Sequence, residues 1–212
     1  MNFTNKDLSL YLVTDRRWLI GKTLAEEVED AIKGGVTFVQ LREKELNHKE
    51  FLIQAKEIRK ITHRYNVPFV INDNIEIAIE SDADGVHVGQ TDRSVKEIRT
   101  LLGKNKIIGL SASTVSSARE GEALGADYIG VGAVFSTSTK LDASCVSREQ
   151  LIQICNSISI PVVAIGGITS ENLSSLSGTG IAGVAVVSAI LAQNNSEIAS
   201  KKLLEQLRGM GI

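Results

Sequence analysis

The stretch FVQLREK, residues 38–44, begins like a buried β-strand and turns polar before it ends. Successive side chains of a strand point to opposite faces of the sheet. One face therefore carries Phe38, Gln40, Arg42 and Lys44, and the other carries Val39, Leu41 and Glu43. An unpaired cation on the buried face would cost several kcal/mol. The pattern therefore predicts a partner for these cations, either an anionic ligand or a carboxylate such as Asp73.

Seven further runs of apolar and β-branched residues occur along the chain, and segments with helical periodicity separate most of them. The eight runs are residues 9–15, 37–43, 68–73, 85–89, 106–113, 127–135, 161–168 and 183–190. Strand and helix in regular succession are typical of parallel strands joined by right-handed crossovers. Eight such strands predict a closed (β/α)8 barrel, the TIM-barrel fold, with residues 1–212 as a single domain. An open doubly wound sheet is the alternative, which the even repeat and the absence of an early GxGxxG motif disfavour.

The segments between the runs carry apolar residues at helical spacing and recognisable helix ends. Two of these apolar stripes are Leu24, Val28, Ala31 and Ile32, and Phe51, Ala55, Ile58 and Ile61. Gly34-Gly35 is expected to end the first helix. Ser147 with Gln150 predicts a capping box for the helix before the seventh strand, and Thr114 predicts a similar cap after the fifth. The segment 196–210 predicts a final helix.

The composition of the 212 residues is that of a globular protein, with 43% hydrophobic and 23% charged residues. A formal net charge of -2 gives no broad basic field for nucleic acid or an anionic membrane, so an anion site must be local. Cys145 and Cys155 form no CxxC motif and are expected to be reduced thiols. No basic segment precedes a long apolar run at the N-terminus and no window approaches a membrane span, which predicts a cytoplasmic location.

Polar residues and glycines collect where the runs end, and in a parallel barrel the site is built at these C-terminal ends. They are Gln40, Arg42, Lys44, Asn72, Asp73, Gln90, Asp92, Ser111, Ser136, Thr137, Ser138, Thr139, Lys140, Gly166, Gly167 and Ser188. We therefore expect one polar rim. Gly166-Gly167 and Ser188 follow the seventh and eighth strands, where such barrels often bind a phosphate through backbone N–H groups.

Asp73 and Asp92 follow adjacent strands and should lie near each other. Two carboxylates can share a proton, hold a hard divalent cation, or pair with Arg42 and Lys44. The neighbouring cations and the lack of a histidine at the strand ends favour Mg²⁺ that bridges the carboxylates to a diphosphate.

Three features keep two interpretations each. Thr137, Thr139 and Lys140 form either a phosphate cradle or a plain Ser/Thr surface loop. His87 shares the phase of Gly85 and Gly89, so it should face the barrel interior, as a packed and hydrogen-bonded histidine rather than a catalytic base. Trp18 follows the first strand as a lid residue or a surface anchor.

Eight short motifs, in this order and spacing, resemble the thiamine-phosphate synthase family. They are YLVTD (11–15), QLREK (40–44), VIND (70–73), GVHVGQTD (85–92), IIGLSAST (107–114), STSTK (136–140), AIGGI (164–168) and VAVVSAI (184–190). AIGGI occurs in many phosphate-binding barrels, whereas QLREK, VIND and GQTD together with TSTK are specific. The resemblance implies a (β/α)8-barrel transferase. Its reaction condenses 4-amino-5-hydroxymethyl-2-methylpyrimidine diphosphate with 4-methyl-5-(2-phosphoethyl)thiazole, giving thiamine phosphate and pyrophosphate.

The resemblance also implies a role for individual residues. The pyrimidine diphosphate would be held by Gln40, Arg42, Lys44, Asn72, Ser111 and Lys140, of which Arg42, Lys44 and Lys140 would be catalytic. The thiazole phosphate would be held by Thr137, Thr139, Gly167, Val187 and Ser188, and the cofactor Mg²⁺ by Asp73 and Asp92. One departure is Ser136, which stands where the family usually has proline. Proline would have fixed φ there, so the change bears on loop order more than on function.

Two other functions fit the same scaffold. One is the thiazole tautomerase that resembles this family, and the other is a sensor that binds a phosphorylated ligand without catalysis. The tautomerase would not need the diphosphate and metal groups, whose complete presence favours the synthase. Both alternatives retain ligand binding, so binding data would not separate the three. The expected partners are small phosphorylated substrates, without nucleic acid or membrane, and the chain is compatible with a homo-oligomer.

Overall fold

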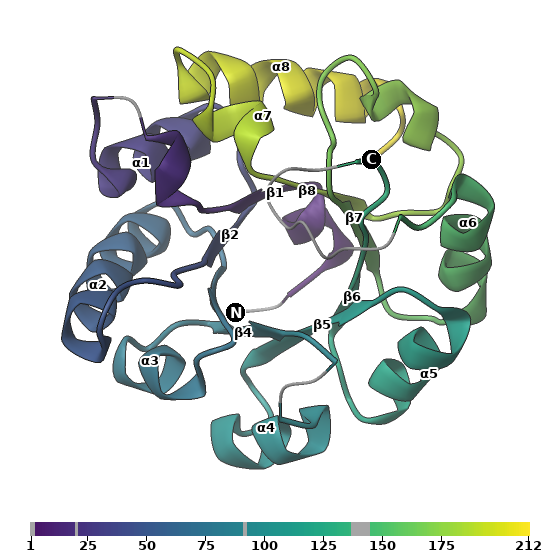
Figure 1. Ribbon diagram of the computed structural model, residues 1–212, viewed down its shortest axis with the longest axis horizontal. Coiled ribbons are helices and arrows are strands. Elements are labelled where there is room, and N and C mark those ends of the chain that lie inside the picture. Colours follow the sequence, from purple (N-terminus) through teal and green to yellow (C-terminus); the bar gives the residue numbers. More distant parts are fainter. Residues whose placement is uncertain (1–2, 20, 91–92, 137–144) are drawn as a thin grey trace.

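Eight parallel strands close into a barrel in the order of the chain, and β8 pairs with β1 (Figure 1). The computed structural model describes residues 3–19, 21–90, 93–136 and 145–212. The predicted (β/α)8 barrel is confirmed, and the open sheet is wrong because both edges of the sheet are paired with each other.

The strands are shorter than the apolar runs that predicted them. Their bounds are β1 Leu10–Val13, β2 Phe38–Leu41, β3 Phe69–Asn72, β4 Gly85–Val88, β5 Ile107–Ala112, β6 Tyr128–Val131, β7 Val162–Ile165 and β8 Gly183–Val186. In the β1–β2 register Tyr11 lies opposite Phe38 and Val13 opposite Gln40. The polar ends of the runs therefore leave the strands as loops at the carboxyl end of the barrel.

Helices surround the strands on the outside of the barrel (Figure 1). The α-helices are α1 Leu24–Lys33, α2 His48–Arg64, α3 Ile75–Glu80, α4 Val95–Leu102, α5 Val115–Ala123, α6 Arg148–Ser157, α7 Ser188–Leu191 and α8 Ser196–Gly209. Short 3-10 helices are η1 Asn5–Leu8, η2 Arg16–Trp18 and η3 Leu173–Leu176. In the part of the chain that the structure describes, no helix is long and apolar enough to cross a membrane.

The helix ends follow the sequence with one exception. α1 ends at Lys33 with Gly34 as its C-cap, and a Cβ on Gly34 would lie only 2.2 Å from the carbonyl oxygen of Glu197 in α8. Thr114 forms its capping box as predicted. The box at Ser147 is half formed, because Ser147 accepts from the Gln150 backbone N–H while the Gln150 amide donates to the Ser113 carbonyl at 2.7 Å. Gln150 thus ties α6 to the loop after β5.

Two apolar clusters divide at the strands. The larger one lies between the strands and the helices and includes Val39 and Leu41. The smaller one fills the amino-terminal part of the barrel interior and includes Tyr11, Phe38 and Tyr128. The aromatic rings are in contact, with 4.6 Å between the centroids of Tyr11 and Phe38. Because this layer fills the lower barrel, the space for a ligand is at the carboxyl end of the strands.

The two cysteines match their prediction as free thiols. Cys145 is exposed and Cys155 is half-buried, and neither forms a disulfide. Burial raises the pKa of the Cys155 thiol to about 11, so it stays protonated at neutral pH.

Candidate active site

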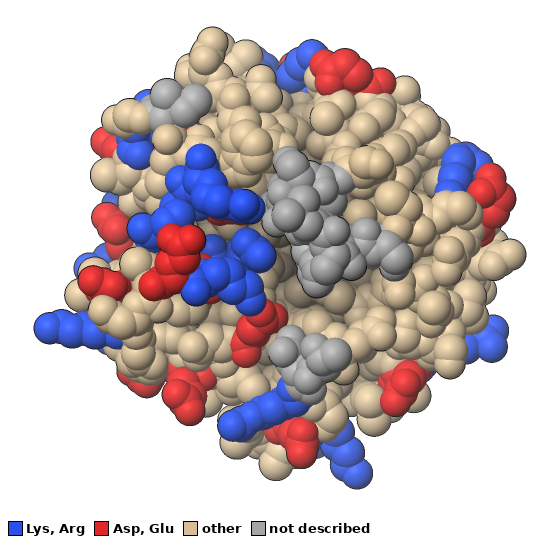
Figure 2. Space-filling view, viewed as in Figure 1, with Lys and Arg blue, Asp and Glu red and all other residues tan. Residues whose placement is uncertain are grey.

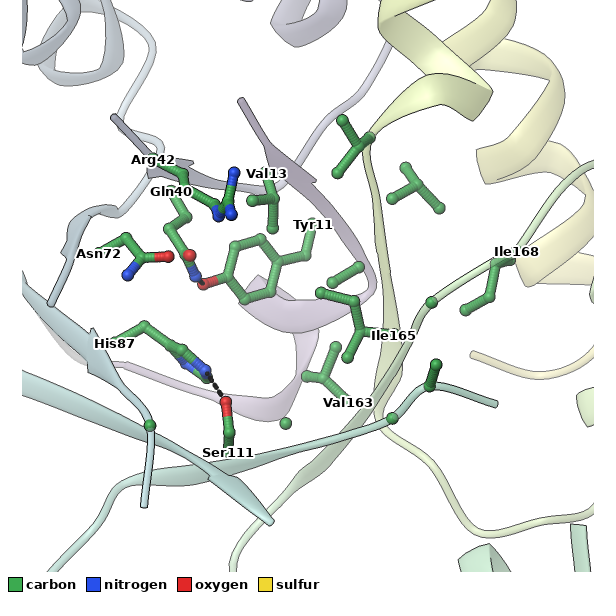
Figure 3. A pocket seen from close by; sticks show the side chains of 18 of the residues that line it. Tyr11, Val13, Gln40, Arg42, Asn72, His87, Ser111, Val163, Ile165 and Ile168 are labelled. Atoms are coloured by element: carbon green, nitrogen blue, oxygen red, sulfur yellow. Dashed lines mark hydrogen bonds between the residues drawn. The ribbon is translucent and has the colours of Figure 1, made fainter. Parts of the chain in front are cut away.

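A cavity of about 420 Å³ opens at the carboxyl ends of the strands. It is lined by Tyr11, Val13, Gln40, Arg42, Lys44, Asn72, Asp73, His87, Gly89, Ser111, Tyr128, Gly130, Gly132, Ala133, Val163, Ile165, Gly166, Gly167, Ile168, Ala185, Val186, Val187 and Ser188. Figure 3 shows polar residues on one side, among them Arg42, Gln40 and Asn72, and Val163, Ile165 and Ile168 on the other. The cavity is thus suited to a ring with a charged substituent.

Nine residues predicted for the site line this one cavity. They are Gln40, Arg42, Lys44, Asn72, Asp73, Ser111, Gly167, Val187 and Ser188. Asp92, Thr137, Thr139 and Lys140 lie outside the described residues. The structure thus brings together groups from β2, β3 and β5 and from the loops after β7 and β8 at the mouth of one cavity. These residues lie up to 148 positions apart in the sequence.

The end of β2 has the two faces that alternation predicts. Phe38 belongs to the cluster inside the barrel, and Gln40, Arg42 and Lys44 line the cavity above it. Glu43, on the opposite phase, has a side chain only 2% exposed and pairs with Arg16 at 3.0 Å. Figure 2 shows the basic side chains gathered on one side of the hollow at the barrel mouth. Arg42 and Lys44, which we call the cationic wall, therefore both come from the loop after β2.

A carboxylate lies near each of the two cations, Arg42 and Lys44. The sequence predicted either such a carboxylate or an anionic ligand as their partner. Lys44 Nζ lies 2.6 Å from Asp73 Oδ2, and Arg42 Nη1 lies 3.8 Å from Asp15 Oδ2. An ammonium has three donors and a guanidinium five. Among the described residues these contacts engage a minority of those donors, and the Lys44 side chain is 54% exposed. Both cations can therefore still bind an anion.

Asp15 is the buried counter-charge at the end of β1. Its carboxylate accepts from the Arg17 side chain at 2.6 Å and from the Arg17 backbone N–H at 3.1 Å. Burial alone would raise the pKa of Asp15, but the hydrogen bonds from Arg17 and the charges of Arg17 and Arg42 outweigh it and hold the pKa below its ordinary value. Asp15 is therefore ionised at neutral pH and orients two guanidinium groups at the rim.

Asp73 follows β3 with a left-handed backbone, at a φ of 61°. Its backbone N–H donates to the His87 carbonyl at 2.9 Å, which anchors this turn to β4. Aspartate tolerates this conformation better than most residues. The turn puts a partly buried carboxylate at the rim beside Asn72.

The donor set is of the kind that Mg²⁺ prefers. Mg²⁺ is usually bound by one or two carboxylates together with phosphate oxygens of the substrate. The described residues contain no group of three or more acidic, histidine or cysteine side chains that could hold a metal by themselves. Asp73 together with a substrate diphosphate would fit the arrangement of carboxylate and phosphate oxygens. Asp92, the second predicted ligand, lies outside the described residues.

The floor of the cavity carries two tyrosine hydroxyls that the sequence did not single out. The hydroxyls of Tyr11 and Tyr128 lie 2.8 Å apart, and both side chains are buried. His87 is hydrogen-bonded through both ring nitrogens, to Tyr128 and to Ser111, each at 2.9 Å. The expectation of a packed, hydrogen-bonded His87 is confirmed. Alternation along β1 could have predicted one of the two tyrosines, because it points the Tyr11 side chain and its hydroxyl into the barrel.

The glycine side of the cavity follows β7 and β8. Gly166 and Gly167 have φ angles of 101° and 66°, which only glycine adopts readily. A Cβ on Gly167 would lie 2.4 Å from the Ser136 carbonyl oxygen. The backbone N–H groups of Ser188 and Ala189 precede the first bond of α7, which Ile190 donates to the Val187 carbonyl at 3.1 Å. Backbone thus comes within reach of a ligand here.

Trp18, for which the sequence left two interpretations, packs against the main apolar cluster and is partly buried. Its indole Nε1 is buried and has no hydrogen-bond partner among the described residues. This packing fits an anchor of η2 better than a lid.

Fold and site together define a (β/α)8 barrel with a cavity at the carboxyl ends of its strands, where cations follow β2 and glycines follow β7. The family model for thiamine monophosphate synthase matches residues 10–190. The chain belongs to this family, as its motifs predicted.

Three relatives agree with this assignment over nearly the full chain. The thiamine-phosphate synthase of Ruminiclostridium cellulolyticum is 53% identical over 94% of this chain and 95% of its own. That of Methanobrevibacter smithii is 49% identical over 96% of this chain and 97% of its own. The solved structure of thiamine phosphate pyrophosphorylase from Pyrococcus furiosus has a TM-score of 0.90 at 36% identity and covers 97% of this chain and 98% of that one.

Proposed function

We propose that this chain is a thiamine-phosphate synthase of thiamine biosynthesis. It would join 4-amino-5-hydroxymethyl-2-methylpyrimidine diphosphate to 4-methyl-5-(2-phosphoethyl)thiazole and release thiamine phosphate and pyrophosphate. The observation that carries this proposal is that groups fit for a diphosphate and groups fit for a second phosphate share the mouth of one cavity. At about 420 Å³ it lies in the usual range for small-molecule sites.

The polar wall would hold the pyrimidine diphosphate. Gln40 and Ser111, deep in the cavity, would bind the pyrimidine ring, and Asn72 would lie beside it. Arg42 and Lys44 would bind the diphosphate by charge-assisted hydrogen bonds, which are the stronger kind. Lys140, outside the described residues, would join them. Asp15 would keep Arg42 in place for this contact, since it is buried beside the guanidinium.

The opposite wall would hold the thiazole. Gly167, Val187 and Ser188 would bind its phosphate through backbone N–H groups and the Ser188 side chain. Thr137 and Thr139, outside the described residues, would complete that site. The apolar lining between the two substrates would place the thiazole ring against the pyrimidine methylene.

The reaction would proceed by dissociative displacement. The bond between the pyrimidine methylene carbon and the diphosphate oxygen breaks, and pyrophosphate leaves with the electron pair. The electron-rich aminopyrimidine carries the positive charge of the methylene until the lone pair of the thiazole nitrogen forms the new C–N bond. Arg42 and Lys44 would stabilise the charge that builds on the leaving oxygen.

Asp73 and Asp92 would hold Mg²⁺, which supplies further neutralisation of the diphosphate oxygens when it is bound. Asp73 Oδ2 lies 2.6 Å from Lys44 Nζ. This pair keeps a carboxylate and an ammonium side by side, as a metal-bound diphosphate needs.

The apolar wall would protect the reactive methylene. Val13, Val163 and Ile165 line that side of the cavity, offer no nucleophile and would exclude water once the substrates are bound. Positioning of the two rings and electrostatic stabilisation would then account for catalysis without a covalent intermediate.

The test incubates the pure protein with both substrates and Mg²⁺ and measures thiamine phosphate and pyrophosphate. The synthase makes both above the control without protein. A thiazole tautomerase isomerises the thiazole substrate and makes neither product, and a sensor binds ligand without any turnover. Either of these results would overturn the proposal.

Two further expectations stay proposals. A homo-oligomer is tested by the molar mass in solution, and a cytoplasmic location by fractionation of the cells that make the protein.

A further inference from the structure

A continuous chain of hydrogen bonds runs beneath the cavity from β2 to β5. Figure 3 shows its last link, between His87 and Ser111. Gln40 Nε2 donates to the Tyr11 hydroxyl, which lies 2.8 Å from the Tyr128 hydroxyl. The Tyr128 hydroxyl lies 2.9 Å from His87 Nδ1, and His87 Nε2 lies 2.9 Å from Ser111 Oγ. We call these five residues the relay. Its two ends, Gln40 and Ser111, are the residues that the proposed function assigns to the pyrimidine ring.

The donor at one end sets the direction of every bond, because each hydroxyl has a single proton. Gln40 donates to the oxygen of Tyr11, so the Tyr11 proton is left for Tyr128. Both hydroxyls are in side chains at most 1% exposed, where a proton without an acceptor is costly. Tyr128 then donates to His87 Nδ1.

The same rule carries through the imidazole to the cavity. Neutral His87 that accepts at Nδ1 has its proton on Nε2, and this N–H donates to Ser111 Oγ. The Ser111 proton is then left for the cavity. At the other end, Gln40 Oε1 has no partner among the described residues and is left as an acceptor.

We propose that Tyr11, Tyr128 and His87 are positioning residues that hold His87 as the Nε2–H tautomer and so present Gln40 as an acceptor and Ser111 as a donor. The ligand part of this proposal rests on the proposed function. A heterocycle with an amino group next to a ring nitrogen offers a donor beside an acceptor, which complements this pair. An analogue with an oxo group in place of the amino group places an acceptor against Gln40 Oε1 and is discriminated against.

Two glycines make room for the relay, which is independent support for it. Gly109 and Gly130 occupy positions of β5 and β6 that side chains of a barrel interior would otherwise fill. A Cβ on Gly109 would lie 2.4 Å from the Tyr128 hydroxyl oxygen and 2.5 Å from His87 Nδ1. A Cβ on Gly130 would lie 3.0 Å from His87 Cε1. The barrel therefore gives up apolar packing at two positions to hold these rings.

The tautomer of His87 tests the direction of the relay without any ligand. Rotation of the Gln40 amide by a half turn would reverse every bond and place the proton on Nδ1. ¹⁵N chemical shifts of the imidazole nitrogens distinguish the two tautomers. The chain has three histidines, and His48→Gln and His63→Gln variants assign the signals. The proposal expects Nε2–H in the ligand-free protein at neutral pH, and a predominant Nδ1–H form overturns it.

Kinetics test the positioning role. Tyr128→Phe keeps the ring and removes the donor to His87. The KM for the pyrimidine diphosphate is expected to rise about tenfold, the effect of one lost hydrogen bond. The KM for the thiazole phosphate stays unchanged. The inhibition constant of the 4-oxo analogue falls toward the KM for the pyrimidine diphosphate. Tyr11→Phe, which interrupts the relay one step earlier, is the second variant.

The matched control is Phe38→Leu. Phe38 packs on both tyrosines, with ring centroids 4.6 and 5.7 Å away, and has no polar group. Phe38→Leu should lower the melting temperature. The His87 tautomer and the preference for the aminopyrimidine over its oxo analogue should both persist. If Phe38→Leu changes the preference as much as Tyr128→Phe does, packing and not hydrogen bonding is responsible, and the relay is refuted.

The failure of the relay and the failure of the proposed function give different results. A protein that makes no thiamine phosphate overturns the function, whatever the tautomer is. An active protein with the Nδ1–H tautomer, or one whose Tyr128→Phe and Tyr11→Phe variants keep the pyrimidine KM, overturns the relay alone.

Discussion

Replacement of Arg42 by alanine separates the catalytic role of the cationic wall from its structural role. The Arg42 side chain is 25% exposed, and its ion pair with Asp15 is long, at 3.8 Å. Its backbone N–H bond to Thr14 Oγ1, at 3.0 Å, survives the substitution. A partly exposed pair of this kind contributes up to about 1 kcal/mol to stability. We therefore expect Arg42→Ala to fold and to unfold at nearly the temperature of the parent.

The loss in rate should be much larger than the loss in stability. Removal of a donor that stabilises transition-state charge costs about 2.7–4 kcal/mol, so kcat should fall by a factor on the order of 10²–10³. Arg42→Lys keeps the positive charge but loses the planar guanidinium. Its kcat should therefore lie between that of the parent and that of Arg42→Ala.

The assay follows pyrophosphate release at saturating substrate and Mg²⁺, and thermal unfolding is followed in parallel. Arg119→Ala is the control, since Arg119 lies on α5 and contacts the Ser157 carbonyl at 3.4 Å, away from the cavity. A kcat of Arg42→Ala within threefold of the parent would refute the reasoning. So would a loss of activity that merely follows a loss of folded protein.

Four further predictions concern single residues. Asp73→Ala should raise the Mg²⁺ concentration at half-maximal rate, and an unaltered metal titration would remove Asp73 from the metal site. Gly34→Ala should lower stability by about 1–3 kcal/mol with kcat unchanged, because its Cβ would meet the Glu197 carbonyl oxygen at 2.2 Å. The folded pKa of Asp15 is depressed, so its contribution to stability is present above its unfolded pKa of about 3.9 and is lost as pH falls through the folded pKa. Asp15→Asn should therefore flatten the acid limb of stability against pH, which unfolding in urea between about pH 2 and 6 would reveal.

Lys140→Ala, at a position outside the described residues, should slow turnover by one to a few orders of magnitude for the same reason as Arg42→Ala.

The sequence predicted those features that depend on periodicity. The alternation at residues 38–44 placed Gln40, Arg42 and Lys44 on one face, and the cavity confirms it. The eight apolar runs predicted the closed barrel, because strand–helix succession and right-handed crossovers leave few topologies. Both signals are local in the chain, and each is set by a repeat of two or of about 3.6 residues.

What the sequence did not predict depends on partners far apart in the chain. Tyr11 and Tyr128 meet across 117 positions, and no local pattern pairs one hydroxyl with the other. The bond of Gln150 to the Ser113 carbonyl replaced the second half of a capping box, since a tertiary partner was within reach. Asp15 was seen only as the end of a strand motif, although its carboxylate orients Arg17 and pairs with Arg42.

The resemblance to a family added what physical reasoning from the residues left open. Phase alone required an anion or a carboxylate beside Arg42 and Lys44, and the structure has the carboxylates in place. The identity of the anion came from the motifs, and the relatives agree with that family. The roles of the individual residues stay predictions that the variants above test.

The most direct test of the central claim is the stoichiometry of the two products in one reaction. Pure protein with both substrates and Mg²⁺ should release thiamine phosphate and pyrophosphate one to one, and the release should stop when the limiting substrate is consumed. Pyrophosphate without thiamine phosphate would show that water and not the thiazole captures the methylene, and absence of both products would contradict the account altogether.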